Sequence, residues 1–144
     1  MEKYSVLIIE DDSTIAEAIR SHLEKWQYRV KILENFKDII PELERFKPEL
    51  ILLDIMLPFF NGFYWCAEIR KFSKVPIIFI SSADDNMNIV MAMDMGGDDF
   101  ISKPFDLTVL TAKINALLRR SYSFKGQINI LKHNSVSLNL SAGT

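Results

Sequence analysis

Short apolar runs recur along the chain and are separated by segments in which apolar residues have helical spacing. The runs at 4–9, 50–53 and 75–80 contain few polar side chains, which is typical of strands buried on both faces of a parallel sheet. Two weaker runs, at 28–33 and 99–102, are interpreted as further strands. The pattern therefore predicts five strands.

The segments between these runs carry apolar residues every three or four positions, which predicts amphipathic helices. In 13–26 these positions include Ile15, Ile19 and Leu23. Pro41 is compatible with a second helix only near its first turn, where a proline removes no helical hydrogen bond. The further helices are predicted over residues 36–46, 61–72, 85–95 and 107–120.

Five strand–helix units predict an α/β domain, built as a doubly wound parallel sheet with helices on both faces. Right-handed crossovers leave few topologies, and a five-stranded sheet in a chain of this size favours the strand order 2-1-3-4-5 of the flavodoxin-like fold. We assign residues 1–121 to this domain.

Residues 122–144 have a different composition, with more Ser, Asn and Lys. Two short runs, 127–131 and 135–140, flank turn residues and predict two strands. Because two strands alone do not make a stable domain, this tail is either an appendage that pairs with the first domain or the start of a truncated second domain.

Composition narrows the functional classes. The 144 residues are 49% hydrophobic and 25% charged, and the net charge of −2 gives no electrostatic footprint for nucleic acid. The single cysteine, Cys66, excludes an intramolecular disulfide and fits a buried, inert thiol in a reducing cytoplasm. The N-terminus lacks a signal-peptide pattern and the apolar runs are too short to cross a bilayer, so we expect no membrane insertion.

Polar side chains gather where the predicted strands end. Glu10 and Asp11 follow the first strand, Asp54 the third, Ser81 the fourth, and Lys103 the fifth. Taken singly, they are ordinary helix caps, turn residues and a surface lysine. Taken together, they meet at the carboxyl edge of a parallel sheet, where ligands bind. Clustered carboxylates repel one another unless a cation neutralises them, and Mg²⁺ suits a few carboxylates with water and phosphate oxygens.

One carboxylate in such a site is able to attack phosphorus and form an aspartyl phosphate. A magnesium ion and Lys103 would stabilise the charge that develops on the phosphoryl oxygens. The hydroxyl of Ser81 would then move toward the finished phosphate, which links the chemistry to a change of shape.

These residues, in order and spacing, resemble the signature of two-component response-regulator receiver domains. The resemblance covers residues 4–120. The residues that carry it are Glu10-Asp11, Asp54-Ile-Met-Leu-Pro58, Asn61-Gly62, Ser81 and Lys103-Pro104-Phe105.

The resemblance implies a role for each site residue. Asp54 accepts the phosphoryl group from a sensor histidine kinase. Asp11 and Asp54 bind Mg²⁺ through their carboxylates, Met56 through its backbone carbonyl, and Glu10 through a water molecule. Such a domain is a phosphoacceptor rather than an enzyme with a small-molecule substrate.

The resemblance also implies a switch. Lys103 pairs with the phosphoryl group, and its peptide bond to Pro104 is expected to be cis. Ser81 supplies the switch hydroxyl. Phe100 occupies the switch aromatic position, where the family commonly has tyrosine, so the hydroxyl contact of that tyrosine is absent here.

The segment from Gly96 to Phe105 is similar to the OmpR/PhoB-like class, in which the receiver precedes a winged-helix DNA-binding domain. That class forms homodimers on phosphorylation through the fourth helix, fifth strand and fifth helix. Of the positions concerned, Asp99 and Lys113 match its cross-subunit charge pairs, whereas Ile89 and Val109 replace charged residues with apolar ones. The alternative for the two charges is a solvated pair that contributes little.

A closer likeness is to the subgroup of that class that responds to antimicrobial peptides such as bacitracin. It rests on Phe63-Tyr64-Trp65-Cys66 and on 76–82. In the loop after Asp54, the pair Phe59-Phe60 is either a docking patch for the kinase or folded back onto the following helix. By this resemblance 127–140 are the first strands of a winged helix, and the chain stops before any recognition helix, so DNA binding requires the missing part.

Three other classes share some of these features. A haloacid-dehalogenase-type phosphatase needs a second acid two residues after its nucleophile, and Met56 stands there. A flavin-binding module needs a loop that holds phosphate, but residues 10–12 are acidic and repel it. A pseudo-receiver that acts without phosphorylation is disfavoured by the complete set of site residues, although Phe100 and the loop residues 59–60 keep it open.

Overall fold

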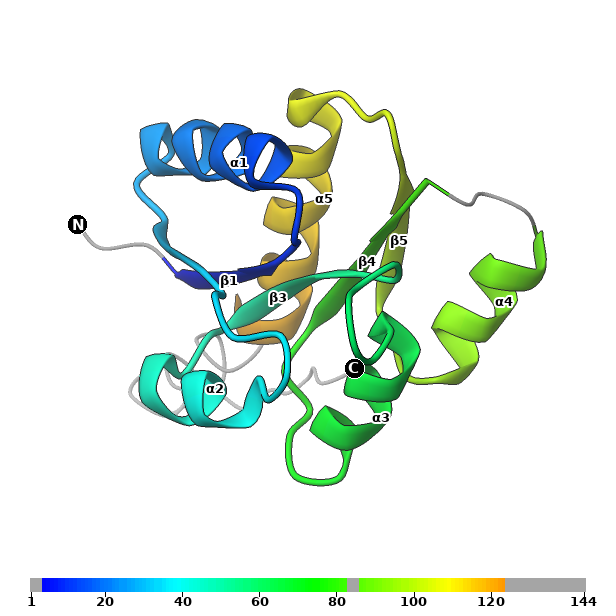
Figure 1. The fold of residues 1–144 in the computed structure, drawn as a ribbon. Coiled ribbons are helices and arrows are strands. Elements are labelled where there is room, and N and C mark those ends of the chain that lie inside the picture. Colours follow the sequence, from blue (N-terminus) through cyan, green and yellow to red (C-terminus); the bar gives the residue numbers. More distant parts are fainter. Residues whose placement is uncertain (1–3, 83–85, 124–144) are drawn as a thin grey trace, which may run out of the picture.

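The computed structural model describes residues 4–82 and 86–123. Five parallel strands form one sheet in the order β2-β1-β3-β4-β5, so the predicted fold and strand order are confirmed. Helices cover both faces of the sheet (Figure 1). The predicted strands at 127–131 and 135–140 lie outside the described residues.

The elements alternate along the chain as the pattern predicted. The strands are β1 (Ser5–Ile9), β2 (Arg29–Ile32), β3 (Leu50–Asp54), β4 (Ile77–Ser81) and β5 (Asp99–Ser102). The helices are α1 (Ser13–Lys25), α2 (Ile40–Phe46), α3 (Gly62–Arg70), α4 (Asn86–Asp94) and α5 (Leu107–Leu118), followed by one π-helical turn, η1 (Arg119–Ser123).

The three central strands β1, β3 and β4 are buried along their whole length, which explains their unbroken apolar runs. Successive side chains of a strand point to opposite faces. Val6 and Ile8 therefore join the cluster beneath α1 and α5, whereas Leu7 and Ile9 join the one beneath α2, α3 and α4. Figure 1 shows the same two layers of helices with the sheet between them.

Each helix differs from its predicted range by at least one residue at one end, and α2 differs most. The second helix was predicted from residue 36, but α2 begins at Ile40, because the side chains of Asn35 and Asp38 accept hydrogen bonds from the backbone and form turns before it. Pro41 does lie in its first turn. The fifth helix was predicted to reach residue 120 and ends at Leu118.

The described part of the chain contains no helix that is both long and apolar enough to span a membrane.

Candidate functional site

The predicted site residues converge at the carboxyl edge of the sheet, where β1 and β3 lie side by side. Glu10 directly follows β1, and Asp54 is the last residue of β3. Both side chains are buried, with 2% of each exposed, whereas Asp11 is exposed. Carboxylate oxygens of these three residues lie within 4.8 Å of one another. The topology has therefore brought together two segments that are more than forty residues apart in sequence.

Lys103 enters this cluster from the end of β5. Its Nζ lies 2.8 Å from Oε1 of Glu10 and 3.2 Å from Oδ2 of Asp54. Its backbone N–H donates to the carbonyl of Ser81 at 2.7 Å, which joins it to the end of β4. The peptide bond between Lys103 and Pro104 is cis, as predicted.

The loop after β3 is built tightly against Asp54. The N–H of Met56 donates to Oδ1 of Asp54 at 3.1 Å. Gly62, the first residue of α3, packs so closely that a Cβ there would lie 2.4 Å from the carbonyl oxygen of Asp54. This contact is a physical reason for the glycine in the Asn61-Gly62 pair, and the Asn61 side chain caps α3 by accepting from the N–H of Tyr64.

The cluster holds more negative than positive charge. Burial, followed by hydrogen bonding and repulsion from Glu10, raises the pKa of Asp54 to about 7, although Lys103 and the Met56 N–H act in the opposite direction. Burial lowers the pKa of Lys103, but its contacts with Glu10 and Asp54 outweigh that effect, so the pKa of Lys103 is raised. The ammonium group of Lys103 thus pairs with two buried carboxylates.

A hard divalent cation fits this set of donors. The three carboxylates offer oxygen ligands at one point, and a second positive charge there would relieve the repulsion that raises the pKa of Asp54. Met56 lies two residues after Asp54, next to this cluster, but a role for its carbonyl stays a prediction.

The two predicted switch residues lie on neighbouring strands. Ser81 is completely buried at the end of β4, beside Ser102 of β5. Phe100 is partly buried against the cluster beneath α2, α3 and α4.

The residues predicted for a dimer interface lie on α4, β5 and α5. Lys113 Nζ is 3.3 Å from Oδ1 of Asp99, so these two charges pair within one chain. Val109 is 48% exposed and Ile89 is partly buried. Sequence reasoning missed three further large apolar side chains of α4 that are exposed: Val90, Met91 and Met93.

Both side chains of the pair Phe59-Phe60 are exposed, and a docking role for them stays a prediction. Phe60 folds back onto α3, with its ring 4.5 Å from that of Tyr64 and 5.5 Å from that of Trp65. Phe59 has a positive φ of 70° and is 66% exposed, with Lys37 Nζ 5.2 Å from its ring centre. Cys66 is buried as predicted, and burial raises the pKa of its thiol.

Comparison with known proteins agrees with this arrangement. The family model described as "response regulator receiver domain" matches residues 6–115. Transcriptional regulatory protein YvcP of Bacillus subtilis, itself described as uncharacterized, is 55% identical over 119 residues, which are 83% of this chain and 50% of YvcP. Sensory transduction protein BceR of Halalkalibacterium halodurans is 46% identical over 129 residues, which are 90% of this chain and 56% of BceR.

Among solved structures, the N-terminal domain of the nisin resistance regulator NsrR, described as a lantibiotic response regulator, superposes with a TM-score of 0.76. It is 56% identical, and the match covers 82% of this chain and all of that domain. The chain spans about half the length of the curated relatives that it matches. The fold, the convergence of the strand-end residues and these matches agree. The chain therefore belongs to the family of response-regulator receiver domains.

Proposed function

We propose that the chain accepts a phosphoryl group on Asp54 from a sensor histidine kinase. One observation carries the proposal: the buried carboxylate of Asp54 lies at the end of β3, in contact with Lys103 and clustered with Glu10 and Asp11. Membership of the receiver family supports the same assignment.

In this proposal Asp11 and Asp54 hold Mg²⁺ through their carboxylates, Met56 through its carbonyl, and Glu10 through water. The bound ion would neutralise negative charge as the phosphoryl group approaches the site. One oxygen of ionised Asp54 attacks phosphorus, and the bond between phosphorus and the donor breaks. Lys103, whose Nζ is 3.2 Å from Asp54, is within reach of the oxygens of the incoming group.

The output of the domain is proposed to be dimerisation. The hydroxyl of Ser81 would turn toward the phosphate, and Phe100 would move with it and alter the surface formed by α4, β5 and α5. The exposed Val109 supports an apolar contact there, and the charges of Asp99 and Lys113 would exchange their intrachain pairing for one across the dimer.

The whole protein is proposed to be a cytoplasmic transcription regulator, without enzymatic turnover, whose DNA-binding part is largely absent from this chain. YvcP is described as a transcriptional regulatory protein, and NsrR as a lantibiotic response regulator. These descriptions support regulation of transcription in response to antimicrobial peptides. We propose that residues 122–144 are the linker and the start of the winged-helix part; residues 124–144 lie outside the described residues.

The test is the intact mass of the protein after incubation with acetyl phosphate and Mg²⁺. We expect a gain of one phosphate in the wild type, and none with Asp54→Asn or with a chelator. Labelling that survives in Asp54→Asn would assign the acceptor elsewhere. No labelling under any condition, and none from a kinase, would favour the pseudo-receiver alternative.

A further inference from the structure

Arg70, the last residue of α3, joins separate segments of the chain at the amino end of the sheet. Its guanidinium donates to the carbonyl of Gly96 through Nε at 3.0 Å and through Nη2 at 2.8 Å. Its Nη1 donates to the carbonyls of Ser73 and Val75 at 3.3 Å and 2.7 Å, and Nη2 also donates to Oδ2 of Asp98 at 3.1 Å. One side chain thus connects α3 and the loop before β4 to the turn between α4 and β5.

The turn that Arg70 contacts closes the C-terminal end of α4. Gly96 has a φ of 106°, and the N–H of Gly97 donates to the carbonyl of Ala92 at 2.9 Å, which is the pattern of a Schellman motif. A Cβ on Gly96 would lie 3.0 Å from Nε of Arg70. The glycine therefore permits both the positive φ of the turn and the close approach of the guanidinium.

The charge of Arg70 also suits this position. The last turn of a helix leaves carbonyl groups without helical partners and carries partial negative charge, which a cation stabilises. The last turn of α4 contains no basic residue and ends at Asp94. Arg70 of α3 therefore supplies the cation that α4 lacks. One turn earlier on α3, the thiol of Cys66 donates to the carbonyl of Met95 at 3.2 Å, so α3 holds this end of α4 at two points.

The described body of α4 is attached less firmly than this end. Among residues 89–94, whose side chains the structure describes, only Ala92 is buried, whereas Val90, Met91 and Met93 are exposed. A segment with few buried apolar side chains moves at a small cost in free energy. Because Arg70 holds the C-terminal end, we expect such movement to be largest toward the N-terminal end of the helix.

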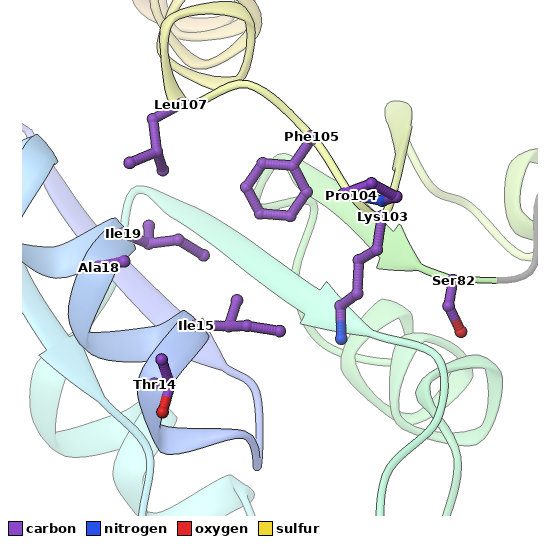
Figure 2. A pocket seen from close by; sticks show the side chains of 9 residues that line it. All are labelled: Thr14, Ile15, Ala18, Ile19, Ser82, Lys103, Pro104, Phe105 and Leu107. Carbon is purple, nitrogen blue, oxygen red and sulfur yellow. The ribbon is translucent and has the colours of Figure 1, made fainter.

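The chain enters α4 from the side of the acceptor site. β4 ends at Ser81, and α4 begins at Asn86. The next residue after β4, Ser82, lines a groove of about 530 Å³ together with Lys103, between α1 and the segment that follows β5 (Figure 2). A displacement of Ser81 toward a phosphate on Asp54 would therefore act on the chain that leads into α4.

We propose that Arg70 is a positioning residue that makes the C-terminal end of α4 the pivot of the switch. The inference rests on the proposed phosphorylation of Asp54 and on the proposed dimerisation through α4, β5 and α5. With its C-terminal end held by Arg70, α4 turns about Gly96 when Ser81 moves, and phosphorylation sets one defined dimer surface. Without Arg70, the helix is held at neither end, and movement of Ser81 no longer defines that surface.

Hydrogen–deuterium exchange tests the anchor without phosphorylation. The N–H groups of residues 95–98 all donate to backbone carbonyls in or beside the turn. Arg70→Met keeps much of the aliphatic stem and removes the hydrogen bonds of the guanidinium. We expect exchange in residues 91–98 to become about tenfold faster, with exchange in β1 and β3 unchanged. Arg70→Lys keeps the charge but not the planar set of donors, so its exchange should be intermediate.

Lys71→Met is the matched control for both measurements. Lys71 is the next residue along the chain, is exposed, and pairs with Glu68 at 2.8 Å. We expect this variant to keep the wild-type exchange in residues 91–98.

The dependence of dimerisation on phosphorylation tests the pivot itself. Sedimentation equilibrium is measured before and after labelling with acetyl phosphate and Mg²⁺, and intact mass gives the labelled fraction. Coupling between two sites commonly amounts to roughly 5–150-fold, so we expect labelling to lower the dimer dissociation constant of the wild type by about tenfold. The ratio of the two constants should fall toward one in Arg70→Met, be intermediate in Arg70→Lys and be retained in Lys71→Met. The rate of labelling should be unchanged in all three variants.

Several outcomes would overturn the inference. Wild-type exchange in residues 91–98 of Arg70→Met would show that Arg70 does not hold the end of α4. Faster exchange with an unchanged ratio of dissociation constants would make Arg70 a structural anchor and not a pivot. If Arg70→Met does not fold, Arg70→Lys serves for both measurements, and wild-type values in that variant would reject the pivot.

The wild type separates this inference from the proposed function. If the wild type is labelled but labelling does not strengthen its dimer, the pivot is wrong while the phosphorylation of Asp54 stands. If the folded wild type is not labelled at all, the proposed function fails first and this inference fails with it.

Discussion

Polar groups at the two ends of the sheet differ in whether the chain itself supplies enough partners for them. At the amino end, the Glu49 carboxylate accepts from the Ser5 N–H at 2.9 Å, and the Glu49 carbonyl accepts from the Tyr122 hydroxyl at 2.8 Å. At the carboxyl end, Glu10 and Asp54 share the single ammonium of Lys103. Polar groups at the first end are satisfied within the chain, whereas the second end has an excess of negative charge. The amino end therefore has hydrogen-bond partners without any ligand, whereas the carboxyl end has carboxylates that a cation would neutralise.

The largest expected loss of stability comes from removing the shared ammonium. Lys103→Met keeps most of the aliphatic stem but leaves the carboxylates of Glu10 and Asp54 without a cation. Breaking a buried ion pair costs about 3 kcal/mol, so we expect a loss of that order in the free energy of unfolding at pH 8 without metal. The loss should be smaller at pH 5, because Asp54, with its pKa near 7, is then protonated. Urea denaturation at both pH values measures this loss. An equal loss at pH 5 and pH 8 would contradict an excess of negative charge around Glu10 and Asp54.

We expect Mg²⁺ to stabilise the fold only through the carboxylate cluster at the carboxyl end of the sheet. A ligand present at about a hundred times its Kd adds roughly 2.7 kcal/mol. Since Mg²⁺ competes with the proton on Asp54, whose pKa is raised to about 7, we expect more stabilisation at pH 8 than at pH 5.5. Thermal denaturation with Mg²⁺, and with sodium at matched ionic strength, tests this. Asp11→Asn is the control, and undiminished stabilisation in it would remove Asp11 from the ligands.

Replacing the acceptor should stabilise the metal-free protein. The pKa of Asp54 is raised to about 7 in the folded state from an ordinary value of 3.8, so the folded protein binds this proton more tightly than the unfolded chain. Stability is therefore lost as the pH rises from about 4 to about 7. The side-chain amide of the Asp54→Asn variant does not titrate, and one pKa unit corresponds to about 1.4 kcal/mol. This variant should therefore exceed the wild type by up to about 4 kcal/mol at pH 8 and by less at pH 5. Equal free energies of unfolding for the variant and the wild type at pH 8 would show that ionised Asp54 does not destabilise the fold.

The smallest effect is expected at the amino end. Tyr122→Phe removes one hydrogen bond, to the carbonyl of Glu49, and keeps the ring that stacks on Tyr4 at 5.4 Å. The expected cost is about 1 kcal/mol. Burial, with the negative charge of Glu49, raises the pKa of Tyr122 to about 12, so this cost should not vary between pH 5 and pH 8. Labelling of Asp54 should be unchanged; a slower rate would mean that the two ends are coupled.

Much of the fold was accessible from local pattern. Unbroken apolar runs such as 50–53 are required of strands covered on both faces, and parallel order follows because helices separate the strands. The helix ends were harder to place. The side chains of Asn35 and Asp38 compete for backbone hydrogen bonds ahead of α2, and an apolar pattern does not register that competition.

The site was predictable as a set of residues but not as a balance of charges. Strand-end positions indicated that Glu10, Asp54 and Lys103 would meet, since parallel strands end at one edge of the sheet. The sequence did not indicate that Lys103 contacts both carboxylates. Nor did it indicate that Phe59 is 66% exposed, or that Phe60, 42% exposed, also packs on α3. Such contacts depend on distances of a few ångströms between segments that are remote in the chain.

By itself, the sequence determined the layered α/β architecture and the residues gathered at one edge of the sheet, because periodicity and strand ends are local properties. Only the tertiary structure decided how strongly those residues interact. Burial raises the pKa of Asp54, and the approach of α1 to the segment after β5 creates the groove beside Lys103. Desolvation and packing arise from the sum of contacts across the whole fold, and no single segment carries them.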